Sequence, residues 1–144
     1  MEPNFEDGEY LIINELGYKK TEIGIGGKDF FSVSPFKELE RGDTIVFKYP
    51  KDPKQYFIKR IIGLPGEKIK VSDGSVYIFN KENPDGFILD ESEYLSGGAT
   101  TPGDLAQNLG ETEYFAMGDN RFYSHDSRAW GPLDKKFVIG KVLI

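Results

Sequence analysis

Hydrophobic residues occur along this chain in short runs that alternate with polar positions and end at glycine, proline or acidic residues. Alternation of this kind is typical of β-strands, in which successive side chains point to opposite faces. It predicts strands at Glu9–Leu16, Asp43–Tyr49, Tyr56–Ile62, Glu67–Val71, Ser75–Phe79, Glu113–Met117 and Phe137–Ile144. Many short strands at regular spacing favour an all-β sandwich or a barrel-like fold.

The segments between these runs contain turn-forming residues. The sequence SDGS at Ser72–Ser75 predicts a hairpin turn, and GLPGE at Gly63–Glu67 predicts a tight turn. Tyr49–Pro53 predicts a connection stiffened by its prolines. No helical period is sustained, and Ser34–Asp43 is interpreted as a turn that leads into a strand.

One long region departs from this pattern. Residues 80–112 are polar and rich in glycine, acidic residues and threonine. We expect a long irregular excursion there, an inserted loop or small subdomain within a single domain that covers residues 1–144.

Composition removes several classes of function. The formal net charge of −6 argues against a nucleic-acid partner, because a DNA-binding protein needs a basic face. With no cysteine and one histidine, the chain has no disulfide and a metal site is improbable. No apolar run reaches the roughly 20 residues of a membrane span, so we expect the chain as printed to be soluble. No cofactor is expected.

The strand at Tyr56–Ile62 carries a lysine among apolar neighbours. Strand alternation places Phe57, Lys59 and Ile61 on one face and Arg60 on the other. Burial disfavours an ammonium and lowers its pKa, and a neutral lysine can act as a general base. On the strand alone the commoner interpretation is an edge-strand lysine that reaches water.

A second polar cluster lies in the sequence MGDNRFYSHDSRAWGP, which follows the strand Glu113–Met117. Loops rich in hydrogen-bonding groups at a strand end often build functional sites, although such a loop can also be a solvated one with internal ion pairs. The tripeptide His125–Ser127 is no catalytic triad, because triad members meet through the fold and not as consecutive residues. We expect His125 to be exposed.

Together these stretches resemble three ordered sequence boxes of the bacterial type I signal peptidases. The boxes are RGDTIVF (Arg41–Phe47), YFIKRIIGLPGE (Tyr56–Glu67) and GDNRFYSHDSR (Gly118–Arg128). Weaker likenesses are VYIFN, LDESEYL (Leu89–Leu95) and the closing strand IGKVLI. The resemblance covers nearly the whole chain in order, and it implies a signal-peptidase-like fold of coiled antiparallel sheets.

The resemblance implies a serine endopeptidase with a Ser-Lys dyad that removes signal peptides from exported preproteins. Lys59 would be the general base, and Ser124 would orient it. Asp126 and Arg128 would form a supporting ion pair, and Asp119 and Asn120 would be structural members of the same loop. Arg60 is expected to be an ion-pair partner.

The family's nucleophile lies in a Ser-Met-x-Pro segment, and this sequence begins Met1, Glu2, Pro3. The nucleophile would stand one position before Met1, so the chain resembles a catalytic domain trimmed just after its nucleophile. It is expected to be inactive as printed. Met1 and Pro3 would lie near the substrate.

The implied location is the cell membrane, with the catalytic domain on the extracytoplasmic face. A membrane-facing end should then expose a patch of apolar side chains. The candidates are Phe5, Phe30, Phe31, Phe36 and Trp130, each of which could equally belong to the core.

Two other functions stay open at this stage. One is a different Ser-Lys peptidase, of the pilin- or conjugation-related type or the self-cleaving repressor type. A repressor should carry a DNA-binding helical domain and a cleavable loop, and the sequence shows neither. The other is a non-catalytic peptide-binding module.

Overall fold

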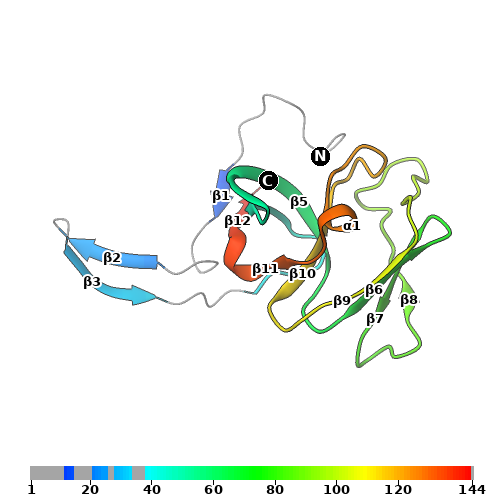
Figure 1. Cartoon of the computed structure of the whole chain (residues 1–144), viewed down its shortest axis with the longest axis horizontal. Helices are drawn as coiled ribbons and strands as arrows, with labels where there is room; N and C mark the ends of the chain where they lie inside the picture. The colour runs from blue at the N-terminus through cyan, green and yellow to red at the C-terminus, as the bar shows by residue number, and fades with distance from the viewer. Residues whose placement is uncertain (1–11, 15–20, 26–27, 34–37, 144) are drawn as a thin grey trace.

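Two antiparallel sheets form the body of the molecule, and a separate hairpin projects from it (Figure 1). The computed structural model describes residues 12–14, 21–25, 28–33 and 38–143. The predicted all-β fold is confirmed, because strands dominate and the described helical segments are single turns.

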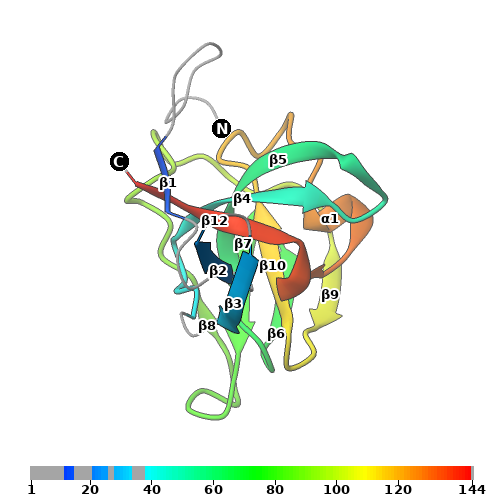
Figure 2. The same ribbon diagram turned by 90° about the vertical axis from the view of Figure 1, so that its left-hand side faces the viewer.

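The larger sheet has six strands in the order β1-β12-β4-β5-β10-β11. Their bounds are β1 Ile12–Asn14, β12 Val138–Leu143, β4 Thr44–Tyr49, β5 Asp52–Gly63, β10 Glu113–Met117 and β11 Leu133–Asp134. Figure 2 shows β4 beside β12, and β4 also pairs with β5, where Ile45 lies opposite Lys59. Strand β5 is therefore central, since β10 pairs with its other edge.

The smaller sheet has four strands in the order β8-β7-β6-β9. Their bounds are β8 Phe87–Ile88, β7 Ser75–Phe79, β6 Lys68–Ser72 and β9 Leu105–Asn108. Asp73 and Gly74 both have positive φ, 51° and 77°, as the predicted hairpin turn between β6 and β7 requires. The projecting hairpin consists of β2 Thr21–Ile25 and β3 Lys28–Val33.

Strand β10 separates two hydrophobic clusters because its residues alternate between them. Tyr114 and Ala116 belong to a cluster with Phe47 and Ile61, whereas Phe115 and Met117 face a second cluster. That second cluster is completed by Ile62 from β5, by Leu109 directly after β9, and by residues of the smaller sheet: Ile69, Val71, Val76 and Ile78. Burial on both faces fixes β10, and β10 leads directly into the polar cluster found in the sequence.

Most predicted strands agree with the observed ones within a few residues. Residues 80–112 were expected to form an irregular excursion, and the strands they contain are the short β8 and β9, which extend the smaller sheet on both sides. Strands β2, β3 and β11, the helical turn α1 (Ser127–Trp130) and the 3-10 turn η1 (Lys135–Phe137) were also not predicted. The connection Tyr49–Pro53 is shorter than expected, because β5 begins at Asp52.

Candidate functional site

Lys59 lies in the middle of β5 with its side chain partly buried. Its Nζ donates a hydrogen bond to the carbonyl oxygen of Ile58 at 3.0 Å and lies 5.5 Å from the centroid of the Phe57 ring. Burial lowers the pKa of Lys59 below its ordinary value of 10.5, against the opposing charges of Asp126 and Asp119. The structure thus favours the neutral amine more than water does, as the sequence predicted.

Gly118, the first residue of the polar loop (Gly118–Arg128), brings Lys59 and Ser124 together. A Cβ atom placed on Gly118 would lie 2.2 Å from Ser124 Oγ and 3.7 Å from Lys59 Cδ. Both side chains therefore pack against the space that a glycine leaves open. Ser124, 65 residues further along the chain, meets the lysine strand here because β10 delivers the loop to β5.

The predicted hydrogen bond between Lys59 and Ser124 is not formed in this structure. Ser124 Oγ is buried and makes no hydrogen bond of good geometry to any described residue. It does lie close enough to the Asp126 carboxylate to help lower the pKa of that group. A buried hydroxyl that makes no hydrogen bond costs free energy. The Ser124 hydroxyl is therefore available to form a hydrogen bond with another group.

The predicted ion pair between Asp126 and Arg128 is present. Arg128 Nη2 lies 2.8 Å from Asp126 Oδ2, and the aspartate side chain is fully buried. Asp126 also caps α1 by accepting from the backbone N–H of Arg128, and it accepts from the N–H of Gly118 at 3.1 Å. Burial raises the pKa of Asp126, but Arg128, Ser124 and Gly118 outweigh it and hold that pKa below 3.8.

Arg60 forms the second ion pair of the site on the opposite face of β5. Its Nε and Nη2 donate to the two carboxylate oxygens of Asp119 at 2.9 Å and 2.8 Å. The predicted ion-pair role of Arg60 is thus confirmed, and the pair fastens the polar loop to the strand that carries Lys59. Asn120 helps close the next turn, since its carbonyl accepts from the N–H of Tyr123.

His125 is exposed, as expected, and takes no part in a triad. Its Nε2 lies 3.1 Å from the hydroxyl of Tyr49, and its ring contacts Phe57 edge-on.

Trp130 was a candidate for the membrane-facing patch, and that prediction is wrong. Trp130 is buried in the cluster that contains Phe47, because α1 turns it inward.

The structure does not describe the side chains of several residues that the sequence predicted for the site or for the membrane-facing patch. Met1, Pro3, Phe5 and Phe36 fall outside the described residues. Phe30 and Phe31 belong to β3, and their side chains are not described. Their proposed roles stay predictions. Two large aromatic side chains of the polar loop that were not predicted for the site, Phe122 and Tyr123, are exposed at 65% and 88%.

Further residues that the sequence analysis did not assign to the site come from the excursion. Arg121 of the polar loop pairs with Glu91 and also donates to Thr101. Tyr94 stacks over Arg60, with its ring centroid 4.5 Å from Arg60 Cζ. The one signal in the sequence was the weak likeness of LDESEYL to a family segment, which attached no role to these residues.

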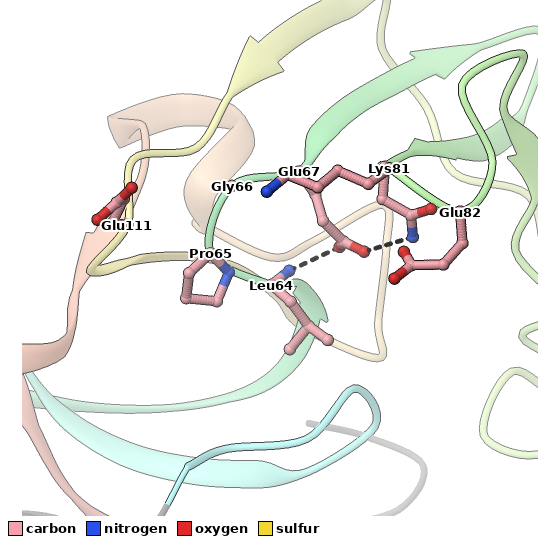
Figure 3. Close-up of a pocket in the computed structure, with 8 residues that line it drawn as sticks. Leu64, Pro65, Gly66, Glu67, Lys81, Glu82 and Glu111 are labelled. Atoms are coloured by element: carbon pink, nitrogen blue, oxygen red, sulfur yellow. Dashed lines mark hydrogen bonds between the residues drawn. The ribbon is translucent and has the colours of Figure 1, made fainter.

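An open cavity of about 490 Å³ lies at the Gly63–Glu67 turn and is lined by neither Lys59 nor Ser124 (Figure 3). One of its lining carboxylates, Glu67, is paired with Arg41 at 2.7 Å. It also accepts from the N–H of Leu64 and from Asn80 (Figure 3). This cavity therefore reflects how the turn is held and does not compete with the Lys59 site.

In the part of the chain that the structure describes, no three His, Asp or Glu side chains lie close enough together to bind one metal ion. Within the same residues, no helix has the length and apolarity to cross a bilayer.

Comparison with known proteins agrees with this geometry. The family model "Signal peptidase, peptidase S26" matches residues 1–144. Signal peptidase I V of Bacillus subtilis is 32% identical over 99% of this chain and 77% of its own length. Probable signal peptidase I-2 of Synechocystis is 30% identical over the whole chain, which spans 57% of that relative.

A solved structure supports the same assignment. The crystal structure of a signal peptidase I from Enterococcus faecalis superposes with a TM-score of 0.60 at 32% identity, covering 75% of this chain and 98% of that one. This match confirms the signal-peptidase-like arrangement of antiparallel sheets. The chain therefore belongs to the bacterial type I signal peptidases of peptidase family S26.

Proposed function

We propose that the chain is the catalytic domain of a serine endopeptidase that cleaves signal peptides from exported preproteins, with Lys59 as the general base. The observation that carries the proposal is the partly buried Lys59, with its lowered pKa, packed beside Ser124 against Gly118. A base must be neutral to accept a proton, and burial is the means by which a lysine becomes so near neutral pH.

The proposed chemistry has two stages. The neutral Lys59 amine accepts the proton of the nucleophilic serine hydroxyl while the serine oxygen bonds to the substrate carbonyl carbon. The C–N bond then breaks, and the Lys59 ammonium returns its proton to the leaving amine. In the second stage Lys59 takes a proton from water while the water oxygen bonds to the ester carbon. The bond between that carbon and the serine oxygen then breaks, the Lys59 ammonium returns its proton to the serine oxygen, and the signal peptide leaves with a new carboxyl group.

Ser124, Asp126 and Arg128 would support this base without touching the bond that breaks. The Ser124 hydroxyl would hydrogen-bond to the Lys59 nitrogen once substrate closes the site, since that hydroxyl has no full partner among the described residues. The buried Asp126–Arg128 pair would hold the loop that presents Ser124. Asp119 and Asn120 would shape the start of the same loop.

The nucleophile in this proposal is a serine directly before Met1. The 144 printed residues carry no serine at that position of the motif. We therefore expect these residues alone to fold and not to cleave, because loss of the nucleophile of a serine peptidase costs on the order of a million-fold in turnover.

The test is a chain that carries a serine before Met1, with a few residues upstream, assayed on an Ala-x-Ala peptide. Cleavage is expected, and Lys59→Ala should abolish it. Lys54→Ala is the matched control, because Lys54 lies on the same strand but is exposed. Cleavage that survives Lys59→Ala would refute the base, and binding without cleavage by the serine-bearing chain would favour a peptide-binding module.

The proposal places the substrate at a membrane surface on the extracytoplasmic side. It is supported by the exposed pair Phe122 and Tyr123, which lies in the same loop as Ser124. Large exposed aromatic side chains beside a site suit an apolar partner such as the lipid boundary or a signal peptide.

A further inference from the structure

Residues 89–102, which connect β8 to β9 of the smaller sheet, contact the polar loop through buried charged groups. Glu91 and Tyr94 come from one turn in which the N–H of Tyr94 and the N–H of Leu95 both donate to the Glu91 carbonyl. Thr101 and Pro102 come from the end of the same segment. We call residues 89–102 the brace.

The strongest contact of the brace is the ion pair between Glu91 and Arg121. Arg121 Nη2 lies 2.5 Å from Glu91 Oε1, and Nη1 donates to the other oxygen at 2.9 Å. The Arg121 side chain is only 1% exposed and the Glu91 side chain 10%. Arg121 also donates to Thr101 Oγ1, so the brace satisfies most of a buried guanidinium.

Tyr94 joins the brace to the second ion pair of the site. Its hydroxyl donates to Glu91 Oε1 at 3.0 Å, and its ring lies over the Arg60 guanidinium. Arg60 in turn holds both oxygens of Asp119. One turn of the brace thus contacts both arginines that fasten the polar loop.

Gly118 transmits these contacts to Lys59. Its carbonyl accepts from Arg121 Nε at 3.1 Å, and its N–H donates to Asp126. The Gly118 peptide groups are therefore held on one side by a residue that the brace fixes. Gly118 is also the surface against which Ser124 and Lys59 pack.

We propose that Glu91 and Tyr94 are positioning residues: through Arg121 and Arg60 they hold Gly118 and Asp119 against β5 and keep water away from Lys59. The excursion is then part of the working site and no mere surface loop. This inference rests on the proposed role of Lys59 as the base.

Two physical effects would follow from breaking the brace, and both act on Lys59 in the same direction. A buried Arg121 without its carboxylate would move toward water and release the Gly118 carbonyl, which would hydrate Lys59. Loosening Arg60 would leave the Asp119 charge less neutralised. Hydration and a stronger negative charge each raise the pKa of Lys59.

The experiment compares Glu91→Gln with Glu93→Gln in the full chain. Glu93 is the matched control because it lies in the same turn and carries the same charge but is exposed. Two quantities are measured: the Lys59 titration midpoint by NMR of ¹³C-labelled lysine, and the hydrogen-exchange rate of the Gly118 amide. Thr101→Val, which removes one acceptor of Arg121 at nearly constant volume, is the milder second variant.

We expect Glu91→Gln to move the Lys59 midpoint up toward 10.5 and to speed Gly118 exchange about tenfold or more. Glu93→Gln should change neither. A folded Glu91→Gln protein that melts earlier but keeps both values would overturn the proposal, since the brace would then be structural only. If Glu91→Gln does not fold, the proposal is tested in Thr101→Val. An unchanged Lys59 midpoint and an unchanged Gly118 exchange rate in that variant would overturn the proposal.

This test is separate from that of the proposed function. If Lys59→Ala leaves cleavage intact, Lys59 is not the base, yet Gly118 exchange still reports whether the brace holds the loop. If cleavage depends on Lys59 but neither the Lys59 midpoint nor the Gly118 exchange rate responds to Glu91→Gln, the proposed function is supported and the positioning role of the brace is refuted.

Discussion

Lys59 illustrates at the scale of one residue how a functional requirement opposes stability. Burial makes the ammonium form less favourable in the folded chain than in the unfolded one, because the unfolded lysine is fully hydrated. Its folded pKa is lowered, so the cost is fully present below that pKa and disappears as the pH rises to 10.5. If stability alone determined the residue at position 59, an uncharged side chain would be favoured over lysine.

Replacing Lys59 with Met should therefore stabilise the protein while it removes the proposed base. A gain of about 1 kcal/mol would raise Tm by roughly 2–4 °C at neutral pH, and the gain should shrink above the folded pKa of Lys59. Calorimetry on Lys59→Met and on the exposed control Lys54→Met measures this. A clear fall in Tm for Lys59→Met alone would mean that the charged amine stabilises the fold.

Gly118 is the other residue whose identity the site dictates. A Cβ there would lie 2.2 Å and 2.6 Å from Ser124 Oγ and Cβ, so the conflict is steric and involves the side chain assigned to orient Lys59. Gly118→Ala should cost about 1–3 kcal/mol through overpacking and should displace Ser124.

Adding Ser124→Gly to Gly118→Ala tests that explanation directly. The second change removes both conflicting atoms, so thermal melting should show most of the loss recovered in the double variant. Equal, additive losses in a double-mutant cycle would show that the two positions are independent.

At the scale of elements, the polar loop is held by buried ion pairs at both ends. Arg60–Asp119 fixes its start and Asp126–Arg128 fixes its end, where Asp126 also begins α1. Each aspartate is essentially buried, so neither pair is the exposed kind that contributes little to stability. The rigidity of the loop depends on these carboxylates remaining ionised.

Acid should therefore weaken the loop through Asp126. Its folded pKa is lowered, so its contribution to stability is present above 3.8 and is lost as the pH falls through the folded pKa. Asp126→Asn should cost about 3–5 kcal/mol at pH 7, because Arg128 keeps a buried charge without its partner.

Urea unfolding across the pH range measures that difference. The gap between the parent chain and Asp126→Asn should be constant at neutral pH and should narrow below pH 3.8. A gap that does not change with pH would assign the loss to packing and not to the ion pair.

The elements that the sequence predicted are those whose apolar pattern is strong. Strands β7 and β10 begin and end where expected: β7 has buried apolar residues at every second position, and β10 is, after Glu113, a continuous apolar run buried on both faces. Strand β8 has two residues and α1 a single turn, so neither shows a period. Strand β9 was missed because its four residues, LAQN, show no clear apolar alternation and include no buried residue, so only its pairing with β6 defines it.

At the scale of the whole molecule, the polar loop that contains Ser124 exposes Phe122 and Tyr123 on the surface. Both are strongly exposed, and they are adjacent residues of the polar loop just before Ser124. If the domain works against a lipid surface, this aromatic pair is a candidate contact, since among the described residues Phe122 and Tyr123 are the most exposed of the large hydrophobic side chains. Trp130, one of the five candidates named from the sequence, is instead in the core.

Changing Phe122 and Tyr123 together to Ser should weaken binding of the chain to phospholipid vesicles by about tenfold. Ile88→Ser is the control, since Ile88 is similarly exposed but lies on β8 of the smaller sheet. Sedimentation with vesicles gives the partition coefficient. Equal losses in both proteins would indicate nonspecific apolar contact, and no loss in either would remove the pair from the membrane proposal.

The parts of the site that the sequence could predict are those within single motifs. Lys59, Ser124 and the Asp126–Arg128 pair lie in two boxes whose likeness to the family is strong. The brace could not be predicted, because Glu91 and Arg121 stand 30 residues apart and nothing local links a glutamate in a polar segment to one particular arginine. The exposure of Phe122 likewise follows only from how α1 and β10 fold the loop.

The central claim is that burial on β5 makes Lys59 a base, and its titration measures this most directly. In ¹³C-lysine-labelled chain, the resonance that disappears in Lys59→Met should titrate with a midpoint below 10.5, and below the midpoints of the exposed lysines. A Lys59 midpoint at or above 10.5 would contradict the account, because the lysine would then stay protonated and could not accept the serine proton.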